Sequence, residues 1–312
     1  MNKTLQGYIL IISATLIWGF SFVAQKSGMD YVGPHTFNFL RGLIACITLL
    51  PLMIINNKNN KKLESEQTPK TEEEKKKEKR FFMFHAVLNG VILFGGMAFQ
   101  QIGLLHTDAS KAGFITAMYI VLVPILGVFI RQKLRSIQIL CMVLATFGLY
   151  YLCIPQGMGL TFEKGDILVF GCSLLYAVQI HTLAYCSDKV DGVKLAYYQF
   201  VVMGILSLIP ALLFEEITLS GIIAGAVPIL YSGVLSSGIA YTFEIVALKN
   251  IPPMAASFIM SLESVINVFA SIVLLGETLA GREALGSIIM FVAIILAQLP
   301  AKEKDKPWQH KE

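Results

Sequence analysis

The stretch GYILIISATLIWGFSFVAQK (residues 7–26) carries no charged side chain until its last residue, Lys26. A helix of this length crosses a hydrocarbon core of about 30 Å, because each residue adds about 1.5 Å. No small-residue cleavage site of the kind found in secretory signals interrupts it, so we expect it to be retained. The stretch therefore predicts a first membrane span.

The composition extends this prediction to the whole chain. Of the 312 residues, 55% are hydrophobic and only 15% are charged, whereas soluble domains typically carry about 25% charged residues. Long apolar runs predict helices, because a helix satisfies its own backbone hydrogen bonds in lipid. We therefore expect an all-α integral membrane protein with ten transmembrane helices, at about 7–26, 34–56, 82–105, 109–130, 135–153, 165–186, 193–214, 222–246, 253–275 and 282–299.

The distribution of basic residues predicts the orientation. Of the 25 lysines and arginines, 20 lie at the N-terminus, in the even-numbered loops or in the C-terminal tail. By the positive-inside rule, both termini are cytoplasmic, in a multi-pass protein of the plasma membrane. The linker 56–80 alternates blocks of lysine and glutamate, which favours a disordered loop, with contact to lipid headgroups as the alternative. The net charge of +4 reflects this asymmetry and does not indicate nucleic-acid binding.

The two halves of the chain resemble each other. Trp18 precedes Arg41 by the same interval that separates Tyr176 from Gln199, and GMAF (96–99) returns as GIAY (238–241). AGFI (112–115) returns as ASFI (256–259). Because each half has an odd number of spans, five, the second must enter the membrane from the opposite side. Inverted repeats of this kind build secondary transporters with a site near the bilayer midplane.

Several motifs also resemble one family. ATLIWGFSFVAQK (14–26), FNFLRG (37–42), TDASKAGFITAMYIVLVP (107–124) and SLESVINVFASIVLLGETL (261–279) are similar to EamA-type members of the drug/metabolite transporter superfamily. Ser264 stands where the family often has proline, so the sequence offers no proline to kink the ninth span. The resemblance implies two inverted five-helix repeats and the export or exchange of small organic solutes, such as amino acids or other metabolites.

This organisation divides the chain into four parts. The first repeat comprises residues 1–55 and 81–154, interrupted by the cytoplasmic linker 56–80. The second repeat covers 163–300, and a cytoplasmic tail follows at 301–312.

Four residues lie at midplane depth when the helical rise is counted from the start of each span. They are Trp18, Tyr119, Tyr176 and Glu263. Aromatic residues with polar edges usually gather at membrane interfaces, so these positions predict a cavity, with helix packing as the alternative. Gln179, three residues after Tyr176, shares its helix face and joins the candidate substrate-binding set.

Glu263 is the most informative of these residues. A carboxyl group within a span is costly and by default marks a functional site. Away from water it holds its proton more readily, so a coupling proton is a possible partner; a structural hydrogen-bonding role is the alternative. Asn267, four residues on, could hydrogen-bond to it and completes the predicted site.

Other polar residues receive less weight. Gln25 and Gln100 are expected near the outer side. Arg41, about two turns inside the second span, is expected to anchor to headgroups or to pair with a helix-end carbonyl, with attraction of an anionic solute as the alternative. Glu244 and His181 are expected at solvated cytoplasmic ends of their spans.

Rival functions find less support in the sequence. An enzyme would need a dense polar constellation, and we expect no catalytic residue, metal site or cofactor because the histidines are scattered. A receptor or scaffold without transport activity is the alternative, but it would favour a larger extramembrane part than 56–80. No Walker motif appears, so we do not expect direct use of ATP. The histidines are His35, His85, His106, His181 and His310.

Overall fold

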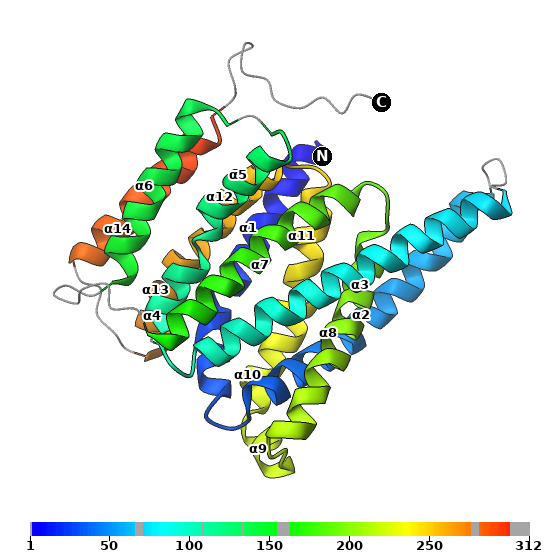
Figure 1. Ribbon diagram of the computed structural model, residues 1–312, viewed down its shortest axis with the longest axis horizontal. Coiled ribbons are helices and arrows are strands. Elements are labelled where there is room, and N and C mark those ends of the chain that lie inside the picture. Colours follow the sequence, from blue (N-terminus) through cyan, green and yellow to red (C-terminus); the bar gives the residue numbers. More distant parts are fainter. Residues whose placement is uncertain are drawn as a thin grey trace.

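The structure is a computed structural model that describes residues 2–65, 71–107, 109–132, 134–154, 163–275 and 281–299. Within these residues all regular structure is helical, as the composition predicts, and the helices pack into one bundle (Figure 1). The helices are α1 (Lys3–Gly28), α2 (Pro34–Ser65), α3 (Glu72–Gly103), α4 (Ala109–Thr116), α5 (Tyr119–Phe129), α6 (Ser136–Cys153), α7 (Lys164–Ser187), α8 (Gly192–Phe214), α9 (Leu219–Ala224), α10 (Ala226–Leu230), η1 (Tyr231–Ala240), α11 (Tyr241–Leu248), α12 (Pro253–Met260), α13 (Leu262–Leu275) and α14 (Gly281–Ala297).

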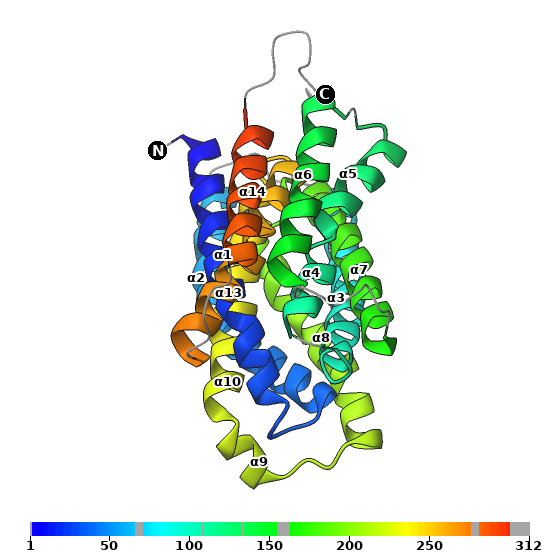
Figure 2. The same cartoon turned by 90° about the vertical axis from the view of Figure 1, so that its left-hand side faces the viewer.

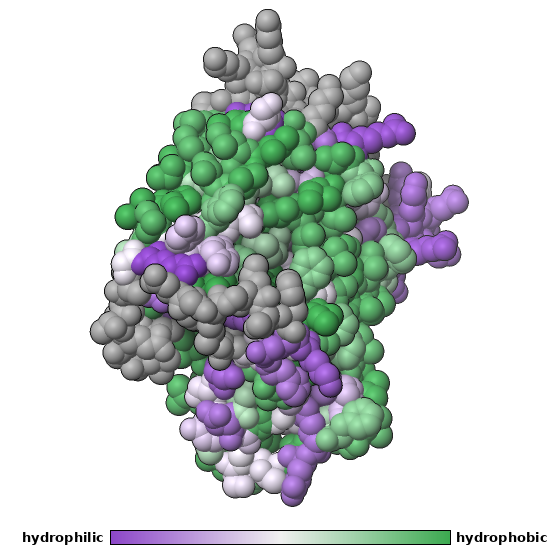
Figure 3. Space-filling model, turned by 60° about the vertical axis from the view of Figure 1, so that its left-hand side comes forward, coloured by the Kyte–Doolittle hydropathy of each residue, from purple (hydrophilic) through white to green (hydrophobic). Residues whose placement is uncertain are grey.

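Nine stretches of the described chain are helical, long and apolar enough to cross a membrane, and they coincide with the first nine predicted spans. At the place of the tenth lies α14, which has 17 residues. Large apolar side chains are exposed along the bundle, including Phe129 (80%) and Phe214 (79%). Figure 3 shows a face covered largely by hydrophobic residues, with hydrophilic residues gathered in a few patches. Such a surface suits lipid as the solvent.

The first and last helices indicate on which side the chain begins and ends. Figure 2 shows that α1 begins and α14 ends at the same end of the bundle. The tail 301–312 lies outside the described residues. An arrangement with both ends of the helical bundle on one side agrees with an even number of crossings.

The expected disordered linker is wrong for much of its length. Helix α2 continues to Ser65 and α3 begins at Glu72, so both extend beyond the other helices side by side (Figure 1). The Thr71 side chain accepts a hydrogen bond from the backbone N–H of Glu74, and the Glu74 carboxylate accepts one from the backbone N–H of Thr71. Lysine and glutamate are good helix formers, and this capping box starts the helix, so charge alone did not prevent order. Residues 66–70 lie outside the described part.

Two of the spans are interrupted in their middle. The fourth span consists of α4 and α5, which are separated at Ala117 and Met118 by tighter turns. The ninth consists of α12 and α13, separated at Ser261, whose hydroxyl donates to the carbonyl of Phe258 at 2.7 Å. Serine bonds of this kind bend helices, so the ninth span is broken although it lacks the family's proline.

The pattern of helix contacts is the same in the two halves when spans one to five are matched with spans six to ten in order. The first span packs on the eighth and ninth, while the sixth packs on the third and fourth. The second and seventh spans pack on each other, and so do the fifth and tenth. Where α6 crosses α14, a Cβ on Gly148 would lie 3.0 Å from the carbonyl oxygen of Gly286, and a Cβ on Gly286 would lie 2.6 Å from that of Gly148. The two backbones therefore approach each other through a reciprocal glycine contact.

The carboxylate of Glu215, between α8 and α9, joins the two halves at the N-terminus of α2. Its two oxygens accept hydrogen bonds from the backbone N–H groups of His35 (2.8 Å) and Thr36 (2.7 Å). Both donors belong to the first turn of α2, which has no intrahelical partner for them, and the helix dipole favours a negative charge there.

We predict that Glu215→Gln lowers the free energy of unfolding by about 1–3 kcal/mol, because a charged acceptor is replaced by a neutral one that accepts at a single oxygen. Thermal unfolding of the purified protein in detergent measures the change. The control is Glu216→Gln, which alters the exposed neighbour in the same loop. Equal unfolding temperatures for the two variants would contradict the capping role.

Candidate functional site

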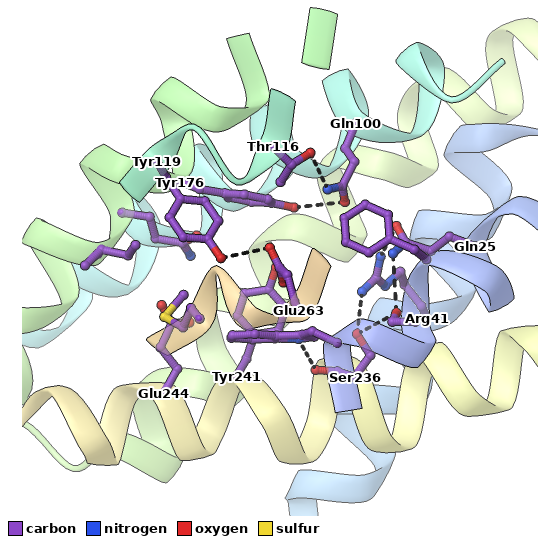
Figure 4. Close-up of a pocket in the computed structure, with 16 residues that line it drawn as sticks. Gln25, Arg41, Gln100, Thr116, Tyr119, Tyr176, Ser236, Tyr241, Glu244 and Glu263 are labelled. Carbon is purple, nitrogen blue, oxygen red and sulfur yellow. Dashed lines mark hydrogen bonds between the residues drawn. The ribbon is translucent and has the colours of Figure 1, made fainter. Parts of the chain in front are cut away.

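A cavity lies where the interrupted fourth and ninth spans meet (Figure 4). It offers about 50 Å³ to the centres of water-sized molecules, and one water needs about 10–15 Å³ by that measure. It therefore has room for a few waters, and a much larger solute requires movement of the walls. The lining residues come from both halves of the chain: Trp18, Ser21, Phe22, Gln25, Arg41, Gln100, Thr116, Tyr119, Tyr176, Gln179, Ile180, Ser236, Tyr241, Glu244, Met260 and Glu263.

The strongest link across the cavity joins the two interruptions. Tyr119 is the first residue of α5 and Glu263 the second of α13, so each follows directly on its break. The Tyr119 hydroxyl donates to Oε1 of Glu263 at 2.8 Å, and both side chains are buried. The breaks bring these polar groups toward each other, which supplies the carboxyl with a partner in a span that contains no cation.

One face of α1 forms a continuous wall of the cavity. The residues of α1 that line the cavity recur at helical spacing. They are Trp18, Ser21, Phe22 and Gln25. Gln25 was expected beyond the site, near the outer end, and that expectation is wrong, because the cavity follows the helix for two turns. Gln100 also lines the cavity, where its amide donates to the Thr116 hydroxyl.

Aromatic rings frame the rest of the site. Trp18 packs edge-on against Tyr241 with ring centroids 5.0 Å apart, and its indole N–H donates to the carbonyl of Ser236. The hydroxyl of Tyr176 donates to Oε1 of Gln100 at 3.4 Å. Tyr241 was not among the predicted site residues, although it ends the GIAY motif of the internal repeat.

Arg41 is buried in the cavity wall, with 2% of its surface exposed. The expectation that it anchors to headgroups or to a helix-end carbonyl is therefore wrong. Its Nε donates to Ser237 Oγ at 2.9 Å, Nη2 to Ser236 Oγ at 3.2 Å and Nη1 to Gln25 Oε1 at 3.4 Å. Helix α2 packs on η1 at this level, which turns the guanidinium inward toward the two serines.

Glu244 was expected in a solvated position, and that is also wrong. Only 3% of its surface is exposed, and it lines the cavity from α11. The reason is tertiary, because α1, α7, α8 and α12 all pack around α11. His181 likewise turns into the protein, where its Nε2 donates to the carbonyl of Val123 at 2.8 Å.

The structure brings together five of the six predicted site residues. Trp18, Tyr119, Tyr176, Gln179 and Glu263 line one cavity. Asn267 is buried but does not line the cavity. Its side chain lies next to Gly113 of α4, where an added Cβ would be 3.7 Å from Nδ2 of Asn267. Asn267 therefore faces the contact between α13 and α4, because one turn of helix carries it past the end of the cavity.

Comparisons with known proteins agree with this architecture. The model of the EamA-like transporter family matches residues 5–154 and again 163–299. A protein of Archaeoglobus fulgidus named an uncharacterized transporter is 26% identical over 95% of this chain and 87% of its own length. The uncharacterized transporter YoaV of Bacillus subtilis is 21% identical over 92% of this chain and 94% of its own.

Two further similarities are more limited. The threonine/homoserine exporter RhtA of Salmonella typhimurium is 27% identical over 56% of this chain and 57% of its own. One solved crystal structure superposes with a TM-score of 0.74 at 16% identity, over 95% of this chain and 96% of that one, and indicates a shared fold. Since the family model covers nearly the whole chain in two matches, this protein belongs to the EamA-like transporter family of the drug/metabolite transporter superfamily.

Proposed function

We propose that this protein is a secondary transporter that moves a small polar organic solute across the membrane by alternating access. The observation that carries the proposal is the cavity lined by both matches to the family model, at the point where the fourth and ninth spans are interrupted. Broken helices at such a site are typical of secondary transporters, because their free backbone and side-chain groups can meet a solute. A scaffold has no need of a cavity lined by an arginine, two glutamates and several amides.

The same proposal includes ten spans arranged as two inverted repeats. Each match to the family model contains five of the predicted spans, and the recurrence of helix contacts at an interval of five supports a pseudo-twofold relation. The reciprocal contact of Gly148 with Gly286 is what such an axis would produce. The excess of lysine and arginine supports cytoplasmic termini in the plasma membrane.

Amino acids are the substrate class that we propose to test first, with export or exchange as the mode. The cavity combines aromatic rings with one arginine and two glutamates, which suits a small solute that carries charge. A relative over 56% of the chain is named a threonine/homoserine exporter, which supports the same class.

Alternating access requires contacts that close each end of the cavity in turn. At the end of the bundle far from the start of α1, Lys111 Nζ lies 2.6 Å from Asp166 Oδ2, and the Thr107 hydroxyl donates to Oδ1 at 2.7 Å. The Asp166 side chain is fully buried. At the other end, Asn56 Nδ2 donates to Asp191 Oδ2 at 2.6 Å. Both contacts join the first half to the second, so we assign them to the two gates.

Glu263→Gln tests the site. We expect it to slow threonine exchange in proteoliposomes at least tenfold and to flatten its dependence on pH, because glutamine cannot exchange a proton. Tyr119→Phe removes the same hydrogen bond but keeps the carboxyl group, so its pH profile should retain its shape.

One outcome of this comparison would favour the structural alternative for Glu263. If both variants lose rate equally while their pH profiles stay unchanged, Glu263 is a structural hydrogen-bond acceptor and not a proton site. Glu216→Gln, in the exposed loop, serves as the control for rate and for the amount of folded protein.

Asp166→Asn tests the gate. Removing one member of a buried ion pair leaves the other uncompensated, so the closed state should lose stability relative to the open one. We expect at least a threefold faster reaction of a membrane-impermeant thiol reagent with a cysteine placed in the cavity by Ser21→Cys. Glu72→Gln breaks the exposed ion pair with Lys75 instead and should leave that rate unchanged. A rate that Asp166→Asn does not alter contradicts the gating role.

A further inference from the structure

The cavity wall holds a buried arginine whose hydrogen-bonding partners are all neutral. Within the part of the chain that the structure describes, Arg41 bonds to two serines and one glutamine, and no carboxylate lies within ion-pair distance of it. A buried guanidinium is costly unless a negative charge accompanies it. Arg41 is therefore a cation that lacks its counter-ion in this state of the protein.

The remaining donors of Arg41 suit a planar anion. A guanidinium has five N–H groups, and the three hydrogen bonds of Arg41 to Ser237, Gln25 and Ser236 use one on each nitrogen. One N–H on each Nη atom remains to donate, and guanidinium N–H groups commonly bind a carboxylate through both of its oxygens. An ammonium group in the same place would be a single point charge.

The surrounding polar groups hold the guanidinium in place without neutralising it. Ser236 accepts a hydrogen bond from Arg41 and another from the Ser21 hydroxyl at 3.1 Å, and the Gln25 amide donates to Ser21 at 3.3 Å. Ser236 and Ser237 both belong to η1, whose wider π-helical turn places successive serines against α2. π-Helical turns occur frequently at functional sites.

A second, independent observation points to a ligand. Gln179 is 2% exposed and lines the same cavity, yet its Nε2 has no hydrogen-bond partner among the described residues. A buried amide donor without a partner is costly, and an oxygen of a bound solute would satisfy it. The site thus offers free N–H donors from both halves of the chain.

The carboxyl groups of the site lie away from Arg41. Figure 4 shows Arg41, Gln25 and Ser236 on one side of the cavity and Glu244 and Tyr119 on the other, with Glu263 between them. The charges are thus separated across the cavity and not paired with one another. A solute that carries both signs would match this arrangement in one orientation only.

We infer that Arg41 is the specificity-determining residue that binds the carboxylate of the transported solute and orients its cationic group toward Glu263 and Glu244. The inference rests on the proposed transport function and adds to it the residue that selects for the anionic group. Solutes without an anionic group leave the guanidinium uncompensated and should bind weakly.

The test uses three probes that differ by one charged group: threonine, 1-aminopropan-2-ol, which lacks its carboxylate, and 3-hydroxybutyrate, which lacks its amine. Binding to the purified full-length protein is measured by calorimetry, and exchange is measured in proteoliposomes. We expect the wild-type protein to bind threonine at least tenfold more tightly than the amine. In Arg41→Lys, which keeps the charge but loses the fork, this ratio should fall below threefold while the affinity for the amine is unchanged.

Ser237→Ala is the matched structural control. It removes one tie between Arg41 and η1 but keeps the guanidinium, so the preference for threonine over the amine should survive. Arg41→Gln removes the charge; if it does not fold, Arg41→Lys still answers the question, because a purely structural role would weaken both probes equally.

The outcomes separate this inference from the proposed function. Equal affinity of the wild-type protein for threonine and the amine, or an unchanged ratio in Arg41→Lys, overturns the role of Arg41. Exchange of solutes that carry no anionic group, with no binding of carboxylates, also overturns it and leaves transport standing. Failure to move any solute in proteoliposomes contradicts the transport function itself.

Discussion

A carboxyl group within a membrane-spanning helix has no water to solvate it, so the protein must supply its partners. In this structure the partner of Glu263 is the hydroxyl of Tyr119, 2.8 Å away. The contact exists because two spans are interrupted at the same level, one before each residue. A continuous helix at either place would present a different face and leave the carboxyl without this bond. The cavity follows from that pair of breaks.

The close approach of the helices depends on small residues as much as on polar ones. Gly19 faces α13, where a Cβ would collide with the side chain of Ile266 and would lie 3.1 Å from the carbonyl oxygen of Glu263. Gly96 lies against the ring of Tyr176, and a Cβ added to Gly96 would be 2.7 Å from that ring. In lipid, association of helices relies on packing and hydrogen bonds more than on the hydrophobic effect, so such contacts set how close the walls of the cavity come. The cavity is narrow because Gly19 and Gly96 have no side chains to hold the neighbouring helices apart.

The two ends of the bundle differ in the kinds of side chain that link the two halves of the chain. Far from the start of α1, a buried ion pair and the carboxylate of Glu215 join the two halves. At the other end the carboxylate of Asp191 accepts a hydrogen bond from the neutral amide of Asn56, and the Tyr8 hydroxyl donates to Gln298 at 3.1 Å. Contacts between charged groups depend on exact geometry, because separating them leaves a charge without a partner. Breaking the ion pair of Lys111 with Asp166 therefore leaves a buried charge, whereas breaking the contact of Tyr8 with Gln298 does not.

Local sequence was sufficient for the class of protein, the positions of nine spans and five members of the cavity. Hydropathy reports the solvent around each helix, and helical spacing reports which residues share a face, so Trp18, Tyr176 and Glu263 could be found one span at a time. The linker was mispredicted because its charge outweighed its helix-forming residues in the prediction. Arg41 and Glu244 could not be placed, since their depth depends on which helices surround them. Only the tertiary structure decided that η1 presents its serines to Arg41 and that four helices enclose Glu244, because such contacts join residues far apart in the chain.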